Sequence, residues 1–259
     1  MIISKKNGKK GEKMAKKVNI IYDFDGTLTK TPIPKYSILE KCGYENGTLN
    51  ENFLKEFMQL KEKNNCSVET AFYELLFQIL KRQKRRYKLK DFLYGSNKIV
   101  FCDGLSNYFN NINNFAQQND IVLSHFVLTS GLKNFVEASR YSKFFTKVYG
   151  CELDVQDNYV DGVSFLLGNK EKIKVLTELQ NDKNTKADFT IYIGDGLTDI
   201  YAMDFNHKNG GINILVRQSK NDDSVYQELN KNGIVDFYEI SNFGKRSKLF
   251  NTICKIIKS

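Results

Sequence analysis

Short apolar runs alternate with amphipathic helical stripes along most of this chain, and this alternation constrains its fold more than any other feature. Strands that alternate with helices form right-handed β-α-β units and a parallel sheet covered by helices on both faces. In such a sheet, ligands bind beyond the carboxyl ends of the strands. The predicted strands are Val18–Asp23, His125–Ser130, Phe189–Ile193, Ile212–Val216 and Ile234–Ile240.

Local signals predict several boundaries. Asp103 and Asn169 each precede a helical stripe, where a side chain of this type caps the first turn. A helix is expected to start near Gly131, directly after the second strand. Asp161-Gly162 lies between two short apolar runs and predicts a hairpin within residues 159–165.

The stretch between the first two strands is too long for one crossover helix. It carries two amphipathic stripes, one around Phe53 and one around Leu75. We therefore predict a helical unit over residues 31–100, inserted into a core built from residues 18–30 and 101–259. Residues 1–17 are basic and have no apolar pattern, which predicts a disordered tail, with Met14 as the native start.

Charge and cysteine content narrow the possible partners. The 259 residues carry a formal net charge of +9, and a basic run extends from Lys81 to Lys90 after a predicted helix. Cations are favoured at a helix C-terminus, so we interpret this run as a solvated helix end and expect no nucleic-acid partner. The five cysteines are scattered and no apolar run approaches ~20 residues, which predicts a cytoplasmic protein without a membrane segment.

Two carboxylates, Asp23 and Asp25, follow the first strand in the motif Asp23-Phe24-Asp25-Gly26-Thr27. Their repulsion is costly unless a cation or a proton lies between them. Mg²⁺ prefers oxygen ligands and would neutralise them. Gly26 permits the turn that follows, and the Thr27 hydroxyl is expected to brace the loop.

This motif, with Leu28 after it, resembles the first motif of the haloacid dehalogenase (HAD) superfamily. The strand that ends in Thr129, with Ser130 and Gly131, resembles the second motif, whose hydroxyl and amides bind phosphate. Lys170 resembles the third motif, a lysine at the start of a helix. Lys172 and Lys174 compete for this role, and we chose Lys170 because it directly follows the predicted cap at Asn169.

The fourth motif resembles Gly194-Asp195-Gly196-Leu197-Thr198-Asp199, which follows the strand that ends at Ile193. The four motifs occur in the superfamily's order, and the long insertion resembles the helical cap of its phosphoserine-phosphatase-like branch. The resemblance implies a Rossmann-like sheet with a helical cap domain. It also implies a magnesium site made by Asp23, Asp25, Asp195 and Asp199.

The implied activity is that of a phosphatase, a Mg²⁺-dependent phosphomonoester hydrolase that acts on a small phosphorylated metabolite. Asp23 is the expected nucleophile and forms an aspartyl phosphate, while Asp25 is the general acid and base. Thr129, Ser130, Gly131 and Lys170 are expected to bind the phosphate. Because Asp25 is present, hydrolysis of a carbon–halogen bond is disfavoured.

Two other functions remain open at the level of sequence. A phosphotransferase or phosphomutase uses the same intermediate and differs in the acceptor. A non-catalytic binding protein of the same fold usually lacks a nucleophile or a metal carboxylate, and this chain has both. His125 and His207 are expected to be structural.

Overall fold

The structure, a computed structural model, describes residues 15–31, 38–43, 51–219 and 224–259. Within these residues, one sheet has the strand order β2-β5-β4-β3-β1-β6-β7-β8. Its strands are β1 Lys16–Tyr22, β2 Tyr87–Lys88, β3 Ile121–Leu132, β4 Lys147–Gln156, β5 Tyr159–Phe165, β6 Phe189–Gly194, β7 Ile212–Arg217 and β8 Phe237–Ile240. All neighbours from β4 to β8 pair in parallel, whereas β5 and β2 pair antiparallel at one edge. The prediction of a parallel α/β sheet is confirmed.

Strand β1 lies in the middle of the sheet because its side chains are apolar on both faces. Ile20, Ile21 and Tyr22 are all buried. The strand pairs in parallel with β3 on one side and with β6 on the other. Both faces of a parallel sheet are covered by helices, so its strands are apolar along their whole length.

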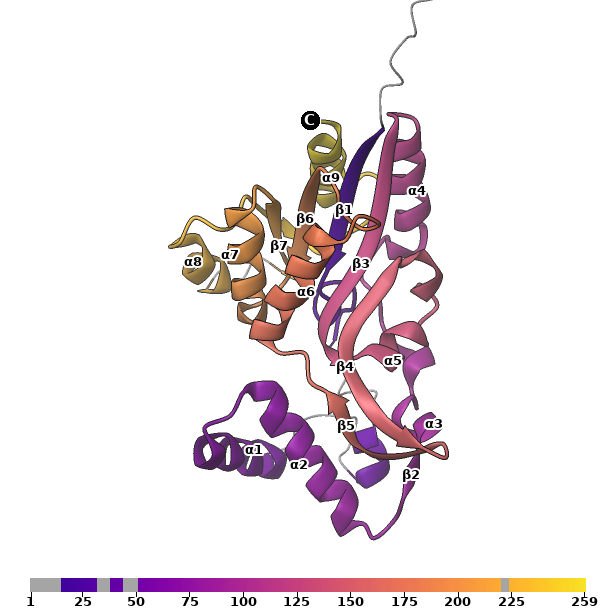
Figure 1. Cartoon of the computed structure of the whole chain (residues 1–259), viewed down its shortest axis with the longest axis vertical. Helices are drawn as coiled ribbons and strands as arrows, with labels where there is room; N and C mark the ends of the chain where they lie inside the picture. Colours follow the sequence, from indigo (N-terminus) through magenta and orange to yellow (C-terminus); the bar gives the residue numbers. More distant parts are fainter. Residues whose placement is uncertain (1–14, 32–37, 44–50, 220–223) are drawn as a thin grey trace, which may run out of the picture.

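Helices pack on both faces of the sheet (Figure 1). Helices α4 and α9 contact each other, as do α6 and α7, and right-handed crossovers place these two pairs on opposite faces. The core helices are α4 Leu105–Gln117, α5 Lys133–Glu137, α6 Asn169–Asn181, α7 Ile200–Lys208, α8 Ser224–Asn230 and α9 Lys248–Lys258.

A separate group of helices lies at one end of the molecule, beside β5 and β2 (Figure 1). It comprises α1 Glu51–Asn64, α2 Val68–Arg82, α3 Leu89–Phe92 and a 3₁₀ helix over Ile38–Cys42. Strand β1 runs toward this end, so the helical group lies on the side where the parallel strands terminate (Figure 1). The two predicted stripes are present: Phe53 in α1 and Leu75 in α2 are buried. The segment 31–100 as an independent domain stays a prediction.

The hairpin of β4 and β5 turns at Asp157-Asn158, so the predicted turn at Asp161-Gly162 is wrong. Asp157 and Asn158 have φ of 50° and 67°. Two successive left-handed residues form the two-residue turn that matches strand twist, and Asp and Asn tolerate this conformation. Asp161 instead lies within β5, where its carboxylate accepts two hydrogen bonds from Arg86, both of 3.0 Å.

Three other predicted boundaries also shift. Strand β3 continues to Leu132, so the next helix begins at Lys133 rather than near Gly131. The cap of α4 is Gly104, with φ of 77°, and not Asp103. A Cβ at Gly104 would collide with the backbone nitrogen of Gly244, so this position requires glycine. Gly168 caps α6 in place of Asn169, which is the first helical residue.

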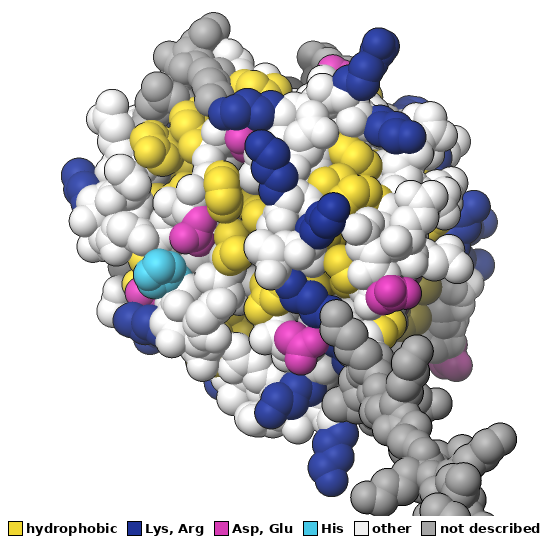
Figure 2. All heavy atoms as spheres, turned by 90° about the horizontal axis from the view of Figure 1, so that it is seen from above, with side chains coloured by type: hydrophobic (Ala, Val, Ile, Leu, Met, Phe, Trp, Pro, Cys, Tyr) yellow, Lys and Arg dark blue, Asp and Glu magenta, His cyan; other side chains and the backbone are white. Residues whose placement is uncertain are grey.

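The remaining predictions concern the N-terminal tail, the distribution of basic side chains and membrane segments. Of the predicted tail, residues 1–14 lie outside the described residues, whereas Lys16 and Lys17 already belong to β1. On the end opposite the helical group, basic side chains lie apart from one another among acidic and apolar ones (Figure 2). In the described part of the chain, every helix is too short or too polar to cross a lipid bilayer.

Candidate active site

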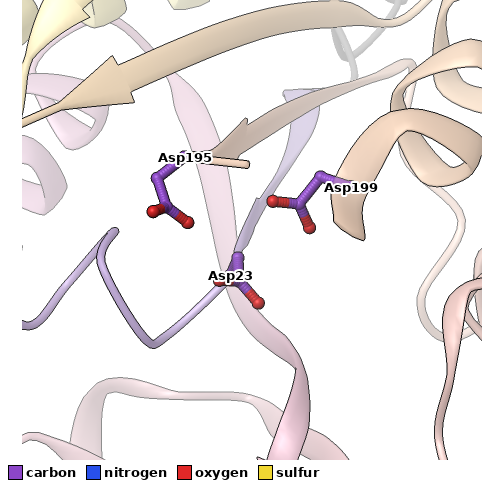
Figure 3. Close-up of side chains that lie close together, drawn as sticks. All are labelled: Asp23, Asp195 and Asp199. Carbon is purple, nitrogen blue, oxygen red and sulfur yellow. The ribbon is translucent and has the colours of Figure 1, made fainter. Parts of the chain in front are cut away.

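Three carboxylates converge at the carboxyl ends of the two central strands. Asp23 directly follows β1, Asp195 directly follows β6, and Asp199 closes a short 3₁₀ turn before α7. One carboxylate oxygen from each residue lies within 4.8 Å of the other two. Their side chains point toward one another (Figure 3).

The carboxylate of Asp23 is held in a buried position. The Asp23 amide donates a 2.8 Å hydrogen bond to the Ile193 carbonyl, which fixes the start of the loop against β6. Only 5% of Asp23 is exposed. Burial first, and the charge of Asp199 second, raise the pKa of Asp23 above its ordinary value, while Lys172 acts against this rise. Cations at this site are therefore needed to keep Asp23 ionised.

Lys172, and not Lys170, is the lysine that reaches these carboxylates. Its Nζ lies 2.8 Å from Asp199 Oδ1 and 3.4 Å from Asp23 Oδ1. Lys172 is fully buried, and although burial by itself lowers its pKa, the attraction of Asp199 and Asp23 raises it. Lys170 is exposed to solvent. The sequence-based choice of Lys170 is therefore wrong.

The helical repeat of α6 explains this correction. Lys172 shares one helix face with Val175, Leu176 and Leu179, all of which are buried. Residues three, four and seven positions apart lie on the same side of a helix. The apolar stripe of α6 therefore indicates that Lys172 points toward the core. The choice of Lys170 assumed a helix cap at Asn169, but the cap is Gly168.

Asp199 and Asp195 are held by neighbours that the sequence analysis did not single out. The Tyr192 hydroxyl donates a 2.7 Å hydrogen bond to Asp199 Oδ1. Arg217, the last residue of β7, donates a 3.0 Å hydrogen bond to the Asp195 carbonyl. Burial first, followed by repulsion from Asp199 and Asp25, raises the pKa of Asp195 to about 7.

The glycines of both motifs make room for these carboxylates. A Cβ on Gly26 would stand 2.2 Å from Asp195 Oδ2, and one on Gly194 would stand 2.5 Å from Asp199 Oδ2. Gly26 also has φ of +78°, which other residues rarely adopt. Three carboxylates faced by one lysine leave uncompensated negative charge, and their oxygens match the preference of Mg²⁺. These residues fit a magnesium ion.

The loop after Asp23 is braced by Thr29 rather than by Thr27. Thr29 Oγ1 accepts a 3.3 Å hydrogen bond from the Gly26 amide and donates one of 2.9 Å to the Thr31 carbonyl. The buried Thr27 hydroxyl has no partner among the described residues, so the expected bracing role of Thr27 is wrong. Asp25 lies on this loop and is half-buried.

The second motif lies inside strand β3. Thr129 is buried, and its Oγ1 accepts a 3.0 Å hydrogen bond from the Gly131 amide. This bond leaves the Thr129 hydroxyl proton available to donate. The buried Ser130 hydroxyl has no partner in the described part of the chain. Because the helix starts two residues later than expected, the Gly131 amide belongs to the strand and not to a helix N-terminus.

Comparisons with known proteins agree with this architecture. The sequence matches no protein-family model and no curated protein. A substrate-bound phosphoserine phosphatase structure matches with a TM-score of 0.62 and 18% identity, over 94% of this chain and 99% of that one. A HAD-family hydrolase from Salmonella enterica serovar Typhi matches with a TM-score of 0.62 and 14% identity, over 87% of this chain and 68% of that one.

This chain has the haloacid dehalogenase fold. A phosphoserine phosphatase structure holding an analogue of its phospho-aspartyl intermediate also matches, with a TM-score of 0.61 and 17% identity, over 92% of this chain and 98% of that one. In this fold, Asp23 and Asp195 directly follow the neighbouring strands β1 and β6, and Thr129 lies within β3, three residues before its end.

Proposed function

We propose that this chain is a cytoplasmic, Mg²⁺-dependent phosphomonoester hydrolase that acts on a small organic phosphate through a phosphorylated Asp23. The observation that carries the proposal is the position of Asp23, which directly follows the central strand with Lys172 3.4 Å away and Asp195 and Asp199 beside it. The fold match to phosphoserine phosphatases, one of them with a phospho-aspartyl analogue, supports the same chemistry.

In the first step, an oxygen of Asp23 attacks phosphorus while the bond from phosphorus to the leaving alkoxide breaks. Asp25 is two residues further along the loop and half-buried, so it is able to protonate the alkoxide as it leaves. In the second step, Asp25 takes a proton from water, which attacks phosphorus and releases phosphate from Asp23. Both residues thereby return to their starting states.

Lys172 and two hydroxyl donors would stabilise the negative charge on the transferred phosphoryl group. The ammonium group of Lys172 lies 3.4 Å from Asp23 Oδ1 and 2.8 Å from Asp199 Oδ1. Thr129 has a free hydroxyl proton, and the Ser130 hydroxyl has no described partner, so both are available to phosphoryl oxygens. Donors fixed in place before the reaction stabilise the charge that develops in the transition state.

Asp23, Asp195 and Asp199 are the side chains that would hold the magnesium ion, together with the Asp25 carbonyl. When bound, Mg²⁺ offsets the charge of a phosphate placed beside carboxylates. Because burial raises the pKa values of both Asp23 and Asp195, this cation also favours the ionised form of the nucleophile.

The test is hydrolysis of p-nitrophenyl phosphate with Mg²⁺ and with EDTA, in the wild type and in Asp23→Asn. We expect turnover only in the wild type with Mg²⁺. A rapid acid quench should trap one phosphoryl group on the wild type, detected by its added mass, and none on Asp23→Asn. Turnover by Asp23→Asn at the wild-type rate would disprove the role of Asp23.

A phosphotransferase with the same intermediate differs only in what attacks the phosphorylated Asp23. The same reaction run with added alcohols distinguishes the two functions. A hydrolase releases all phosphate as the free ion, whereas a transferase forms new phosphate esters in proportion to the alcohol.

A further inference from the structure

Gln218, the first residue after β7, bridges the turn that follows Asp25. Its Nε2 donates a 3.0 Å hydrogen bond to the Gly26 carbonyl and one of 3.4 Å to the Thr29 carbonyl. Because both acceptors are carbonyl oxygens, the amide nitrogen of Gln218 and not its oxygen faces the turn. One side chain thus joins the two ends of this turn.

This bridge spans the end of strand β6. In the sheet, β6 lies between β1 and β7, and neighbouring strands are about 5 Å apart, so Gln218 reaches the turn from two strands away. Asp195 directly follows β6, and a Cβ on Gly26 would collide with its carboxylate. The turn after β1 and the Asp195 carboxylate are therefore in direct contact where Gln218 binds the turn.

The residue before Gln218 holds the second carboxylate loop. Arg217 donates a 3.0 Å hydrogen bond to the Asp195 carbonyl. Two consecutive residues at the end of β7 thus bind the loops that carry Asp25 and Asp195. Both lie outside the four motifs, and both bind backbone carbonyls, which carry no signal in the sequence.

The backbone is fixed on both sides of Asp25. On one side, the Asp23 amide donates a 2.8 Å hydrogen bond to the last turn of backbone in β6. On the other side, the Gly26 amide donates to Thr29 Oγ1 at 3.3 Å, and the Gly26 carbonyl accepts from Gln218. Glycine by itself restricts the backbone least of all residues, so these bonds are what fix the turn.

Gln218 also contacts the chain where it returns from the helical group. Its Nε2 lies 3.3 Å from Cys102 Sγ, and the Cys102 amide donates a 2.9 Å hydrogen bond to the Leu28 carbonyl. Thr29 and Phe101 pair as an antiparallel bridge, so the two connections to the helical group lie side by side. The turn that carries Asp25 continues into one of these connections, and Gln218 ties it to the core.

We propose that Gln218 is a positioning residue for proton transfer by Asp25, because its bonds to the Gly26 and Thr29 carbonyls hold the turn in the place from which Asp25 reaches the leaving group. This inference rests on the proposed phosphatase function. A displacement of about 1 Å can reduce a catalysed rate by about 10²-fold. Two hydrogen bonds to the backbone are therefore enough to affect the reaction without touching the substrate.

The experiment compares two leaving groups in wild type and Gln218→Met, which keeps the length of the side chain and removes its donors. Ethyl phosphate releases an alkoxide that needs a proton, whereas p-nitrophenyl phosphate releases a phenolate that leaves without one. The measured quantity is kcat/KM, which reports the step in which the leaving group departs. We expect Gln218→Met to reduce kcat/KM about 10- to 100-fold for ethyl phosphate and about threefold or less for p-nitrophenyl phosphate.

Two further variants serve as comparisons. Gln218→Glu places a carboxylate oxygen against the two carbonyls and should lose at least as much activity on ethyl phosphate as Gln218→Met. Gln227→Met, at an exposed glutamine of α8, is the matched control and should keep both values. A loss of folded protein would reduce both substrates alike. Equal losses on the two substrates, or an unchanged value for ethyl phosphate, would overturn the proposal.

A double-mutant cycle links Gln218 to Asp25. In the Asp25→Asn background, Gln218→Met should cause no further loss of kcat/KM on ethyl phosphate, because the group that it positions is already gone. Full additivity of the two losses would mean that Gln218 acts through something other than Asp25 and would overturn the proposal.

Amide hydrogen exchange tests the turn without substrate. The amides of Gly26, Leu28 and Thr29 are all bonded within the turn. In Gln218→Met, a peptide that covers residues 24–30 should exchange faster, whereas α9 should exchange as in the wild type. Unchanged exchange in the turn would overturn the proposal. Equal acceleration in α9 would indicate a general loss of stability and would overturn it as well.

These measurements separate the two levels of inference. If the wild type hydrolyses both esters and Gln218→Met keeps their ratio, the phosphatase function stands and the role of Gln218 fails. A wild type that hydrolyses only the aryl ester would show that no proton reaches the leaving group, which also overturns the role. If neither ester is hydrolysed, the proposed function fails, and hydrogen exchange still decides whether Gln218 holds the turn.

Discussion

Lys172 is held in the site by two buried carboxylates, and its own charge is the only protein cation within ion-pair distance of them among the described residues. Removing one partner from a buried charged group typically costs ~3–5 kcal/mol, because the remaining charges stay buried without compensation. The same geometry places the ammonium 3.4 Å from Oδ1 of Asp23, the proposed nucleophile. One side chain thus affects both the stability of the site and the proposed chemistry.

We predict that Lys172→Met reduces kcat by about 10²–10³-fold, the typical loss when one donor to a developing negative charge is removed. Lys170→Met is the matched control and should keep wild-type kcat, because Lys170 is exposed. Steady-state turnover of p-nitrophenyl phosphate provides the measurement, with Tm in Mg²⁺ as the check on folding. A larger loss in Lys170→Met than in Lys172→Met would return the assignment to Lys170.

A second residue-scale prediction concerns the two acids of the first motif. Asp25→Asn keeps the backbone carbonyl and removes proton transfer, which is typically worth about 10²–10⁴-fold in rate. The loss should be larger for alkyl phosphates than for aryl phosphates, whose leaving groups need less protonation. Single-turnover rates against leaving-group pKa, in wild type and variant, measure this. The same slope in both proteins would mean that Asp25 is not the general acid.

At the scale of elements, the loop between β1 and the helical group is held by side chains that look interchangeable in the sequence. Thr27 and Thr29 are both fully buried. Only Thr29 bonds the loop, through the Gly26 amide and the Thr31 carbonyl. The Gln218 side chain adds a 3.0 Å hydrogen bond to the Gly26 carbonyl from the loop after β7. The turn that carries Asp25 is therefore fixed from two directions.

The two threonines provide a matched pair of variants. Thr29→Val should lower the free energy of unfolding by about 1–3 kcal/mol, because it leaves the Gly26 amide without its partner. Thr27→Val should be neutral or slightly stabilising, because the hydroxyl it removes has no described partner. Urea denaturation monitored by far-UV circular dichroism measures both. A larger loss in Thr27→Val than in Thr29→Val would contradict the observed bonding.

The packing of α4 on β3 also includes a buried imidazole. His125 Nε2 donates a 2.8 Å hydrogen bond to Asn113 Oδ1, which leaves Nδ1 of the neutral ring to accept from the Tyr22 hydroxyl at 3.0 Å. Its ring also stacks on Tyr22. Burial lowers the pKa of His125 from 6.5 to about 4. These buried contacts agree with the structural role that was expected from the sequence.

This shift predicts a pH dependence of stability. The unfolded chain binds a proton at His125 below pH 6.5 and the folded chain only below about 4, so stability falls as pH decreases between these values. At pH 5 the loss from this group is about 2 kcal/mol relative to pH 7. His125→Gln should remove that part of the dependence. Tm measured from pH 5 to 7 checks it, and identical pH profiles for the two proteins would contradict it.

At the scale of the whole molecule, the helical group lies at the end toward which β1 runs (Figure 1). Asp23 and Asp195 directly follow β1 and β6. Tyr73 of α2 is buried, and Asp25 acts on it electrostatically from the core loop. We propose that the helical segment within residues 31–100 is a lid that excludes water and bulky phosphates. A phosphate mimic bound at Asp23 would then stabilise the contacts between α2 and the core.

We predict that beryllium fluoride with Mg²⁺ slows amide hydrogen exchange in the first turns of α2 and α6. Helix α9 is the internal control and should exchange as before, because it packs against α4 and β8 instead. Mass spectrometry of peptic fragments measures both regions. Unchanged exchange in α2, or equal slowing throughout the chain, would contradict a lid.

The sequence by itself determined the parallel sheet and the positions of Asp23, Asp195 and Asp199, because buried parallel strands are apolar throughout and polar residues at their ends stand out. It also contained the signal for Lys172 in the apolar stripe of α6. The position of the hairpin turn between β4 and β5 depended on the left-handed backbone conformation of Asp157 and Asn158. The bracing role of Thr29 depended on the folded loop, which brings the Thr31 carbonyl within reach of its hydroxyl. Gln218 and Gly26 are separated by 192 positions in the sequence, and only the tertiary structure decided that they bond, because the sheet places β1 and β7 on either side of β6.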